Sequence, residues 1–176
     1  MKRCQIVVFV ALLLVPVGCD CVSKQVAAHV LANSPGVSFA ADTLRFELTS
    51  NPGAFLSLGA GLPSGWRHLI LLGLVPLLLA TICAVALRSA VPSGWSLLGP
   101  ALVVGGGLAN WLDRLQHGGA VTDFVSFGLG PFRTGVFNLA DASIMAGVAL
   151  LLLARKPGRS RGGTLREEAE GTGEGP

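Results

Sequence analysis

Four long apolar stretches, separated by more polar segments, dominate the hydrophobic pattern of the chain. They cover about residues 5–22, 68–87, 95–113 and 136–154. A helix needs about 20 apolar residues to cross a hydrocarbon core of about 30 Å. The pattern therefore predicts an all-α membrane protein, in which residues 1–154 form one domain with four transmembrane helices.

The first apolar stretch follows two basic residues, a pattern shared by cleaved signal peptides and by first spans. The sequence before Cys19 resembles a lipobox, whose cysteine is lipidated after the upstream segment is removed, although Pro16 fits that motif poorly. Asp20 and Lys24 follow four residues apart, and the sequence stays compatible with a helix to about Leu31. These features favour a retained first helix.

Residues 33–65 lie between the first two predicted spans and are less apolar. Residues 43–48 alternate between apolar and polar positions, which is typical of a half-buried strand. Residues 51–53 are a turn signal, and residues 54–58 can then return as the second strand of a hairpin. We expect a small extracytoplasmic β-platform here, with a simple loop as the alternative interpretation.

The composition supports a membrane protein and argues against nucleic-acid binding, a disulfide framework and a metal site. Of the 176 residues, 51% are hydrophobic and 13% are charged, and the mean hydropathy is +0.64. The net charge of +3 comes largely from basic residues beside the spans, which concerns topology rather than nucleic-acid binding. The four cysteines and three histidines form neither a disulfide framework nor a metal motif, so we expect no metal and no cofactor.

Basic residues predict the orientation of the chain in the membrane. Residues 155–176 are rich in Gly, Arg and Glu and are expected to form a disordered cytoplasmic tail. With both termini in the cytoplasm, eight of the thirteen basic residues lie there, as the positive-inside rule requires, and residues 33–65 and 116–135 lie outside. The eight are Lys2, Arg3, Arg88, Arg155, Lys156, Arg159, Arg161 and Arg166.

A carboxylate inside an apolar span is a candidate functional group, because the bilayer does not solvate it. Asp141 lies in the last span, and Asp123, just upstream of that span, is the obvious second acid. Asn138 is three residues before Asp141, so a helix starting at Val136 would place both on one face. Two carboxylates that share a proton can supply a base and an acid, which suggests aspartyl chemistry.

Further polar residues are expected at the same depth. A helical rise of about 1.5 Å per residue places Asp20 and Asn110 near the outer side of the bilayer, together with Asp141. Asp20 and Lys24, like Asn110 and Arg114, are four residues apart and so share a helix face. Lys24 and Asp113 have an alternative role in tying helices together or reaching the headgroups.

Five motifs in order resemble lipoprotein signal peptidase, the type II signal peptidase family of bacteria. The resemblance covers about residues 5–154, and Ala109 departs from the Gly that the family often has at this position. The motifs are Asp20-Cys21-Val22-Ser23-Lys24, Asn51-Pro52-Gly53-Ala54-Phe55, Gly105-Gly106 to Asn110 with Asp113-Arg114, Val121-Thr122-Asp123-Phe124 and Phe137-Asn138-Leu139-Ala140-Asp141.

The resemblance implies a membrane aspartyl endopeptidase with Asp123 and Asp141 as its catalytic pair. Its substrate would be a bacterial prolipoprotein, cut on the N-terminal side of a diacylglyceryl-modified cysteine. It also implies a monomer in the bacterial cytoplasmic (inner) membrane, in contact with lipid, whose active site lies near the extracytoplasmic face. The residues expected to bind substrate or support the pair are Asn51, Asn110, Arg114, Asn138, Asp20, Lys24 and Asp113.

Two other functions are compatible with parts of the sequence. Paired intramembrane acids also serve as proton relays in transporters, but here they gather at one membrane edge and the spans show no internal repeat of the transporter kind. A lipoprotein anchored through Cys19 is the second alternative, and it requires loss of the first eighteen residues.

Overall fold

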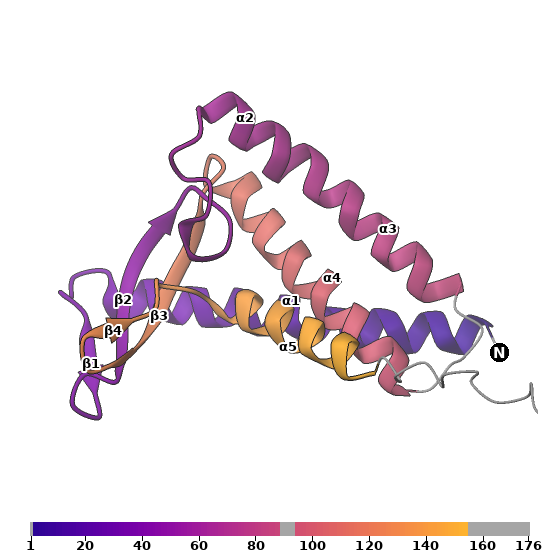
Figure 1. Ribbon diagram of the computed structural model, residues 1–176, viewed down its shortest axis with the longest axis horizontal. Helices are drawn as coiled ribbons and strands as arrows, with labels where there is room; N and C mark the ends of the chain where they lie inside the picture. The colour runs from indigo at the N-terminus through magenta and orange to yellow at the C-terminus, as the bar shows by residue number, and fades with distance from the viewer. Residues whose placement is uncertain (1, 89–93, 155–176) are drawn as a thin grey trace, which may run out of the picture.

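The computed structural model describes residues 2–88 and 94–154, and Figure 1 shows its helices gathered beside a small sheet. Four helical regions occur where the sequence predicts spans, although the first is longer and the last begins later than predicted. By length and composition, two of the described helices are long and apolar enough to cross a membrane: Arg3–Leu31 and Ser64–Arg88. The helices are α1 (Lys2–Leu31), α2 (Ser64–His68), a π-helical segment η2 (Leu69–Leu74), α3 (Val75–Arg88), α4 (Gly94–Gln116) and α5 (Leu139–Leu153).

The β-platform is larger than the sequence predicts, because it combines both segments that are predicted to lie outside the membrane. Four antiparallel strands form one sheet in the order β1-β2-β3-β4. The longest pairing joins β2 to β3, with Thr49 opposite Asp123 and Asn51 opposite Val121. The strands are β1 (Val37–Phe39), β2 (Leu44–Asn51), β3 (Val121–Leu129) and β4 (Phe132–Arg133). Pairing of β2 with β3 therefore brings residues 33–65 and 116–135 together in one sheet.

The prediction of a second strand at residues 54–58 is wrong. Phe55–Ser57 forms a short 3-10 turn, η1, in which Leu56 has φ 52° and Ser57 has φ 65°. A strand requires negative φ at each residue, so this segment cannot pair as one. The hairpin that does form joins β1 to β2.

Helix α4 packs against α1, α3 and α5 and so lies at the centre of the helical part (Figure 1). Its glycine triad, Gly105–Gly107, makes this possible, because each glycine faces a different helix. A Cβ on the first would meet the Leu13 carbonyl of α1, on the second the Ala140 carbonyl of α5, and on the third the Leu79 side chain of α3. Small residues allow helices to approach closely in a membrane, where burial of apolar surface does not drive association.

Gly106→Ala is expected to lower the stability by about 1–3 kcal/mol, the usual cost of overpacking. The new methyl group would press on the backbone of Ala140 and on Ile144 Cγ1, 2.9 Å away. Gly18→Ala in α1 is the matched control, because nothing lies within 4 Å of its Cβ position, and alanine favours a helix by about 0.5–1 kcal/mol over glycine. Thermal unfolding in detergent measures both, and equal melting temperatures would contradict this packing.

The sheet packs against the C-terminal end of α1, beyond Asp20 and Lys24. Ala27 and Leu31 of α1 form a buried cluster with Phe124 of β3, and the partly buried Phe46 and Val125 pack against it. This contact sets the position of the first residues of β3 relative to the helices. Asp123 is therefore held at the junction of sheet and helices.

Candidate active site

Asp123 and Asp141 reach the site from different elements. Asp123 belongs to β3 and is 1% exposed, while Asp141 lies in the first turn of α5 and is 5% exposed. The predicted helical face shared by Asn138 and Asp141 does not exist, because α5 begins at Leu139 rather than at Val136. Asn138 is instead the extended N-cap residue, and its side-chain oxygen accepts the Asp141 backbone N–H at 2.9 Å.

Two carboxamides join the two carboxylates. Asn138 Nδ2 donates to Asp123 Oδ1 at 2.6 Å and to Asn110 Oδ1 at 3.0 Å. Asn110 Nδ2 in turn donates to Asp141 Oδ1 at 2.7 Å. Asn51 Nδ2 donates to the other oxygen of Asp123 at 2.8 Å. The pair of acids and these three amides form one hydrogen-bonded unit drawn from β2, α4, β3 and α5.

Lys24 lies next to this unit and its ammonium group has three polar partners. Its Nζ contacts Asp20 Oδ2 at 2.7 Å, Asp113 Oδ2 at 2.9 Å and Asn110 Oδ1 at 3.2 Å. The other oxygen of Asp20 accepts the backbone N–H of Ala140 at 2.8 Å. Both ion pairs are buried, so each charge depends on its partner.

Arg114 connects α4 to the turn that follows β2. Its Nη1 donates to the carbonyl of Asn110 at 3.1 Å and its Nη2 to the carbonyl of Gly53 at 2.7 Å. The side chain is buried, and its Nε has no partner among the described residues. The same turn is held by Asn51 Oδ1, which accepts the Gly53 N–H at 2.9 Å.

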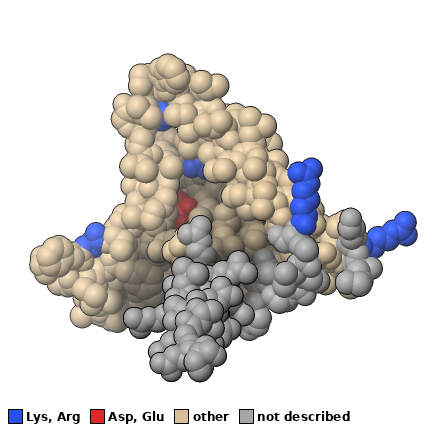
Figure 2. Space-filling view, turned by 45° about the vertical axis from the view of Figure 1, so that its right-hand side comes forward, with Lys and Arg blue, Asp and Glu red and all other residues tan. Residues whose placement is uncertain are grey.

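All nine site residues predicted from the sequence, the two acids and the seven supporting residues, are buried in this region. The hydrogen bonds around the acid pair and the ion pairs of Lys24 are linked through Asn110. Figure 2 shows acidic and basic atoms in a hollow, while the other charged atoms on this face are basic groups spread around it. In residues 2–88 and 94–154, no three His, Cys, Asp or Glu side chains are placed to hold a metal ion. The arrangement can supply paired carboxyl groups and amide or guanidinium donors.

Two residues that the sequence reasoning passed over contact the site through Asp113. His117 Nδ1 lies 2.6 Å from Asp113 Oδ1, and the Thr122 backbone N–H donates to Asp113 Oδ2 at 2.8 Å. The spacing of His117, four residues after an acid on a helix, was the available signal. The Thr122 contact depends on the fold and has no local sequence signal.

Burial raises the pKa of Asp123 to about 6, and the nearby charge of Asp141 also raises it, while the hydrogen bonds from Asn51 and Asn138 lower it. A carboxyl group with a raised pKa binds its proton more tightly in the folded protein. Its contribution to stability is therefore present below its unfolded pKa of about 4 and is lost as the pH rises through about 6. At neutral pH, where Asp123 is ionised, burial of its charge lowers the stability of the folded protein.

Two substitutions should move the pKa of Asp123 in opposite directions. Asp141→Asn removes a neighbouring negative charge and is expected to lower it, whereas Asn51→Ala removes a hydrogen bond to the carboxylate and is expected to raise it. Carbon-13 NMR titration of labelled aspartate in detergent measures both shifts. A rise in Asp141→Asn would show that the two carboxyl groups do not interact as described.

Comparisons with known proteins give the same assignment as the motifs. The family model described as signal peptidase (SPase) II matches residues 11–155. A lipoprotein signal peptidase of Coxiella burnetii (strain RSA 493 / Nine Mile phase I) is 33% identical over 134 residues, covering 76% of this chain and 80% of that protein. A lipoprotein signal peptidase of Beijerinckia indica subsp. indica is 57% identical over 51 residues, which are 29% of this chain and 30% of that protein.

A solved structure supports the fold. A bacterial membrane enzyme, determined by the in meso method at 1.9 Å resolution, superposes with a TM-score of 0.69 and 22% identity over 86% of this chain and 92% of that chain. The family model covers most of the chain, and a relative above 30% identity aligns with most of its own length. The family resemblance of the five motifs is thus confirmed, and the chain belongs to the signal peptidase II family.

Proposed function

We propose that this protein is a membrane aspartyl endopeptidase that removes signal peptides from diacylglyceryl-modified bacterial prolipoproteins, cutting before the lipidated cysteine. The observation that supports this most directly is the pair of buried carboxylates, Asp123 and Asp141, connected by the amides of Asn110 and Asn138. Family membership supplies the reaction class, and the geometry supplies a site that can perform it.

In the proposed reaction, one carboxyl group of the pair is ionised and the other is protonated. The ionised carboxylate takes a proton from water, whose oxygen attacks the scissile carbonyl carbon, while the protonated carboxyl group gives its proton to the carbonyl oxygen. The resulting diol collapses: one of its hydroxyl groups returns a proton to the pair, the C–N bond breaks, and the amine leaves with a proton from the other carboxyl group. The water supplies both the new hydroxyl group and the proton, so the scheme balances.

The other buried polar residues have supporting roles in this scheme. Asn51, Asn110 and Asn138 donate hydrogen bonds that fix the orientation of the carboxylates. Arg114 would support the site by holding the Gly53 carbonyl, and with it the turn that follows β2, against α4. The cluster of Asp20, Lys24 and Asp113 supports Asn110 and the start of α5.

Incubation with a purified diacylglyceryl-modified prolipoprotein tests the function. We expect a gel shift to the mature lipoprotein with a new N-terminus at the lipidated cysteine, and no shift with substrate that lacks the diacylglyceryl group. Ion or solute flux through liposomes without any cleavage would favour the transporter interpretation and contradict the proposal.

We further propose four membrane spans in the bacterial inner membrane, both termini in the cytoplasm, and the sheet on the outer side. The protein would act as a monomer in contact with lipid, without nucleic acid. The bias of basic residues and the positions of the apolar helices support this topology. The predicted disordered tail, residues 155–176, lies outside the described residues.

Cysteine labelling tests the topology in a variant without its native cysteines. An impermeant thiol reagent should reach Ser38→Cys and Leu129→Cys from outside, because both positions are exposed on the sheet. It should reach Gly163→Cys, which lies in the tail, only after the membrane is opened. Labelling of the tail position in intact cells would overturn the proposed orientation.

A further inference from the structure

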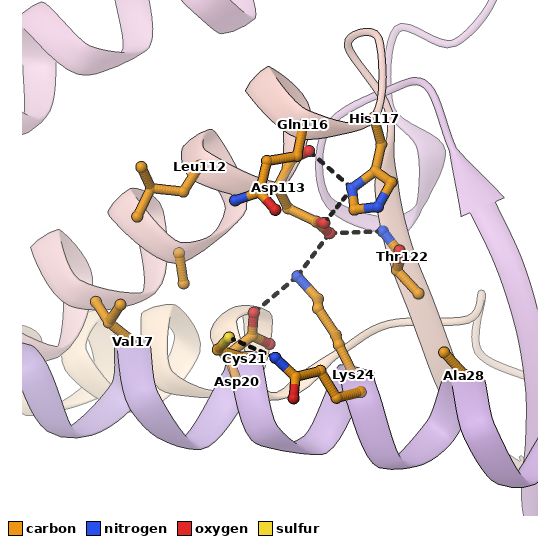
Figure 3. A pocket seen from close by; sticks show the side chains of 12 residues that line it. Val17, Asp20, Cys21, Lys24, Ala28, Leu112, Asp113, Gln116, His117 and Thr122 are labelled. Atoms are coloured by element: carbon orange, nitrogen blue, oxygen red, sulfur yellow. Dashed lines mark hydrogen bonds and ion pairs between the residues drawn. The ribbon is translucent and has the colours of Figure 1, made fainter.

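Asp113 is the point where three elements meet. Its Oδ2 accepts from Lys24 Nζ of α1 at 2.9 Å and from the Thr122 N–H of β3 at 2.8 Å. Its Oδ1 contacts Nδ1 of His117, the residue that follows α4, at 2.6 Å. These residues line a cavity of about 240 Å³, and Figure 3 shows their side chains between α1 and α4. Asp113 therefore ties the end of α4 to both neighbouring elements.

Each contact of Asp113 Oδ2 leads to one acid of the proposed catalytic pair. Lys24 continues to Asn110 Oδ1 at 3.2 Å, and Asn110 donates to Asp141. Thr122 immediately precedes Asp123 in β3. A rotation of the Asp113 carboxylate would disturb both connections together. Its orientation consequently matters for the distance and alignment of the two acids.

His117 is the donor that fixes this orientation. Among the described residues it is the partner of Asp113 Oδ1, while Oδ2 takes the other two donors. Nδ1 also lies 3.0 Å from the backbone carbonyl of Asp113. Because a carboxylate and a carbonyl only accept hydrogen bonds, both contacts require a hydrogen on Nδ1 of the imidazole, which the two oxygens share. The ring stands just beyond the last turn of α4, where Gly118 (φ 61°) and Gly119 (φ 97°) turn the chain toward β3.

We propose that His117 is a positioning residue for the aspartyl pair, an assignment that rests on the proposed function. It holds the Asp113 carboxylate so that Oδ2 can bind Lys24 and the Thr122 N–H at the same time. The His117 side chain is 55% exposed and lines the cavity, so replacing it leaves no buried void. Its loss should therefore act on the geometry of the pair more than on stability.

Three substitutions at this position separate the hydrogen bond from bulk and charge. His117→Asn keeps a donor near the place of Nδ1, His117→Gln moves the donor outward to the place of Nε2, and His117→Ala removes it. We expect kcat to fall about tenfold in His117→Ala and His117→Gln, with KM nearly unchanged, because small misplacements of catalytic groups slow the chemical step. His117→Asn should stay within about threefold of wild type.

Gln116→Ala is the control for the cavity wall. Gln116 is exposed and lines the same cavity, and its side chain makes no hydrogen bond among residues 2–88 and 94–154, so kcat should not change. The rate of hydrogen exchange of the Thr122 amide is a second measurement, which does not depend on enzymatic activity. It should become about tenfold faster in His117→Ala and return toward wild type in His117→Asn, because a hydrogen bond to a charged acceptor protects it.

The outcomes are distinct. Unchanged kcat in His117→Ala, no recovery in His117→Asn, or unchanged Thr122 exchange would each overturn the positioning role. A rise in KM at constant kcat would also overturn it, because that pattern indicates substrate contact. If wild-type protein cleaves no prolipoprotein, the proposed function fails, and the Thr122 exchange still decides whether His117 holds Asp113 in place.

Discussion

Asp123→Asn and Asp141→Asn are each expected to abolish turnover, with a loss of at least about 10³-fold, within the range of general acid–base catalysis. An amide can neither take the proton of water nor alternate between acid and base. The double variant should be no worse than either single variant, since groups that act as one unit are not additive. Rates of cleavage of the diacylglyceryl prolipoprotein measure all three.

Binding and folding provide the controls for this experiment. The Asn variants should still bind the substrate, because in the proposed complex the lipid and the signal helix would be held outside the pair. Asp42→Asn is the matched control, since Asp42 is a half-buried carboxylate on the β1–β2 hairpin, paired with Arg45 and Arg133. It should cleave at the wild-type rate. Turnover above a few per cent in either pair variant would show that water is activated by other acids.

Much of the site could be predicted from the sequence because a membrane makes polar residues conspicuous. A carboxylate in an apolar run has to find a partner, and the i to i+4 spacing of Asp20 and Lys24 predicts the ion pair that the structure contains at 2.7 Å. The approximate positions of the four helical regions follow from apolar runs of about the length that a bilayer requires, although α1 is longer and α5 shorter than that length predicts. These signals are local, and they depend on few tertiary contacts.

The features that were missed depend on contacts between distant residues. Asn51 and Asp123 are 72 residues apart and meet only because β2 pairs with β3, in a register that the local pattern does not define. Asn138 looked like a helical residue because its neighbours are apolar, but it caps α5, and its side chain serves both the helix and Asp123. Positive φ angles at residues 56–57 likewise have no clear local signal.

Lys24→Met is expected to lower stability by about 3–5 kcal/mol, the usual cost of leaving buried charges without their partner. The substitution keeps the length of the side chain but leaves Asp20 and Asp113 facing each other without the cation between them. Asn110 Oδ1 loses a donor as well, so turnover should also fall. Thermal unfolding in detergent, followed by tryptophan fluorescence, measures the change in stability.

Two further variants show whether the effect comes from uncompensated charge. Gln25→Met introduces the same methionine side chain at the adjacent position of α1, which is exposed, and should leave the melting temperature unchanged. Adding Asp113→Asn to Lys24→Met removes one of the two stranded carboxylates and should recover part of the stability. Turnover should stay low in that double variant, because the connection from Lys24 through Asn110 to Asp141 is still broken. If Lys24→Met unfolds at the same temperature as Gln25→Met, Lys24 does not hold the two acids in the buried ion pairs described.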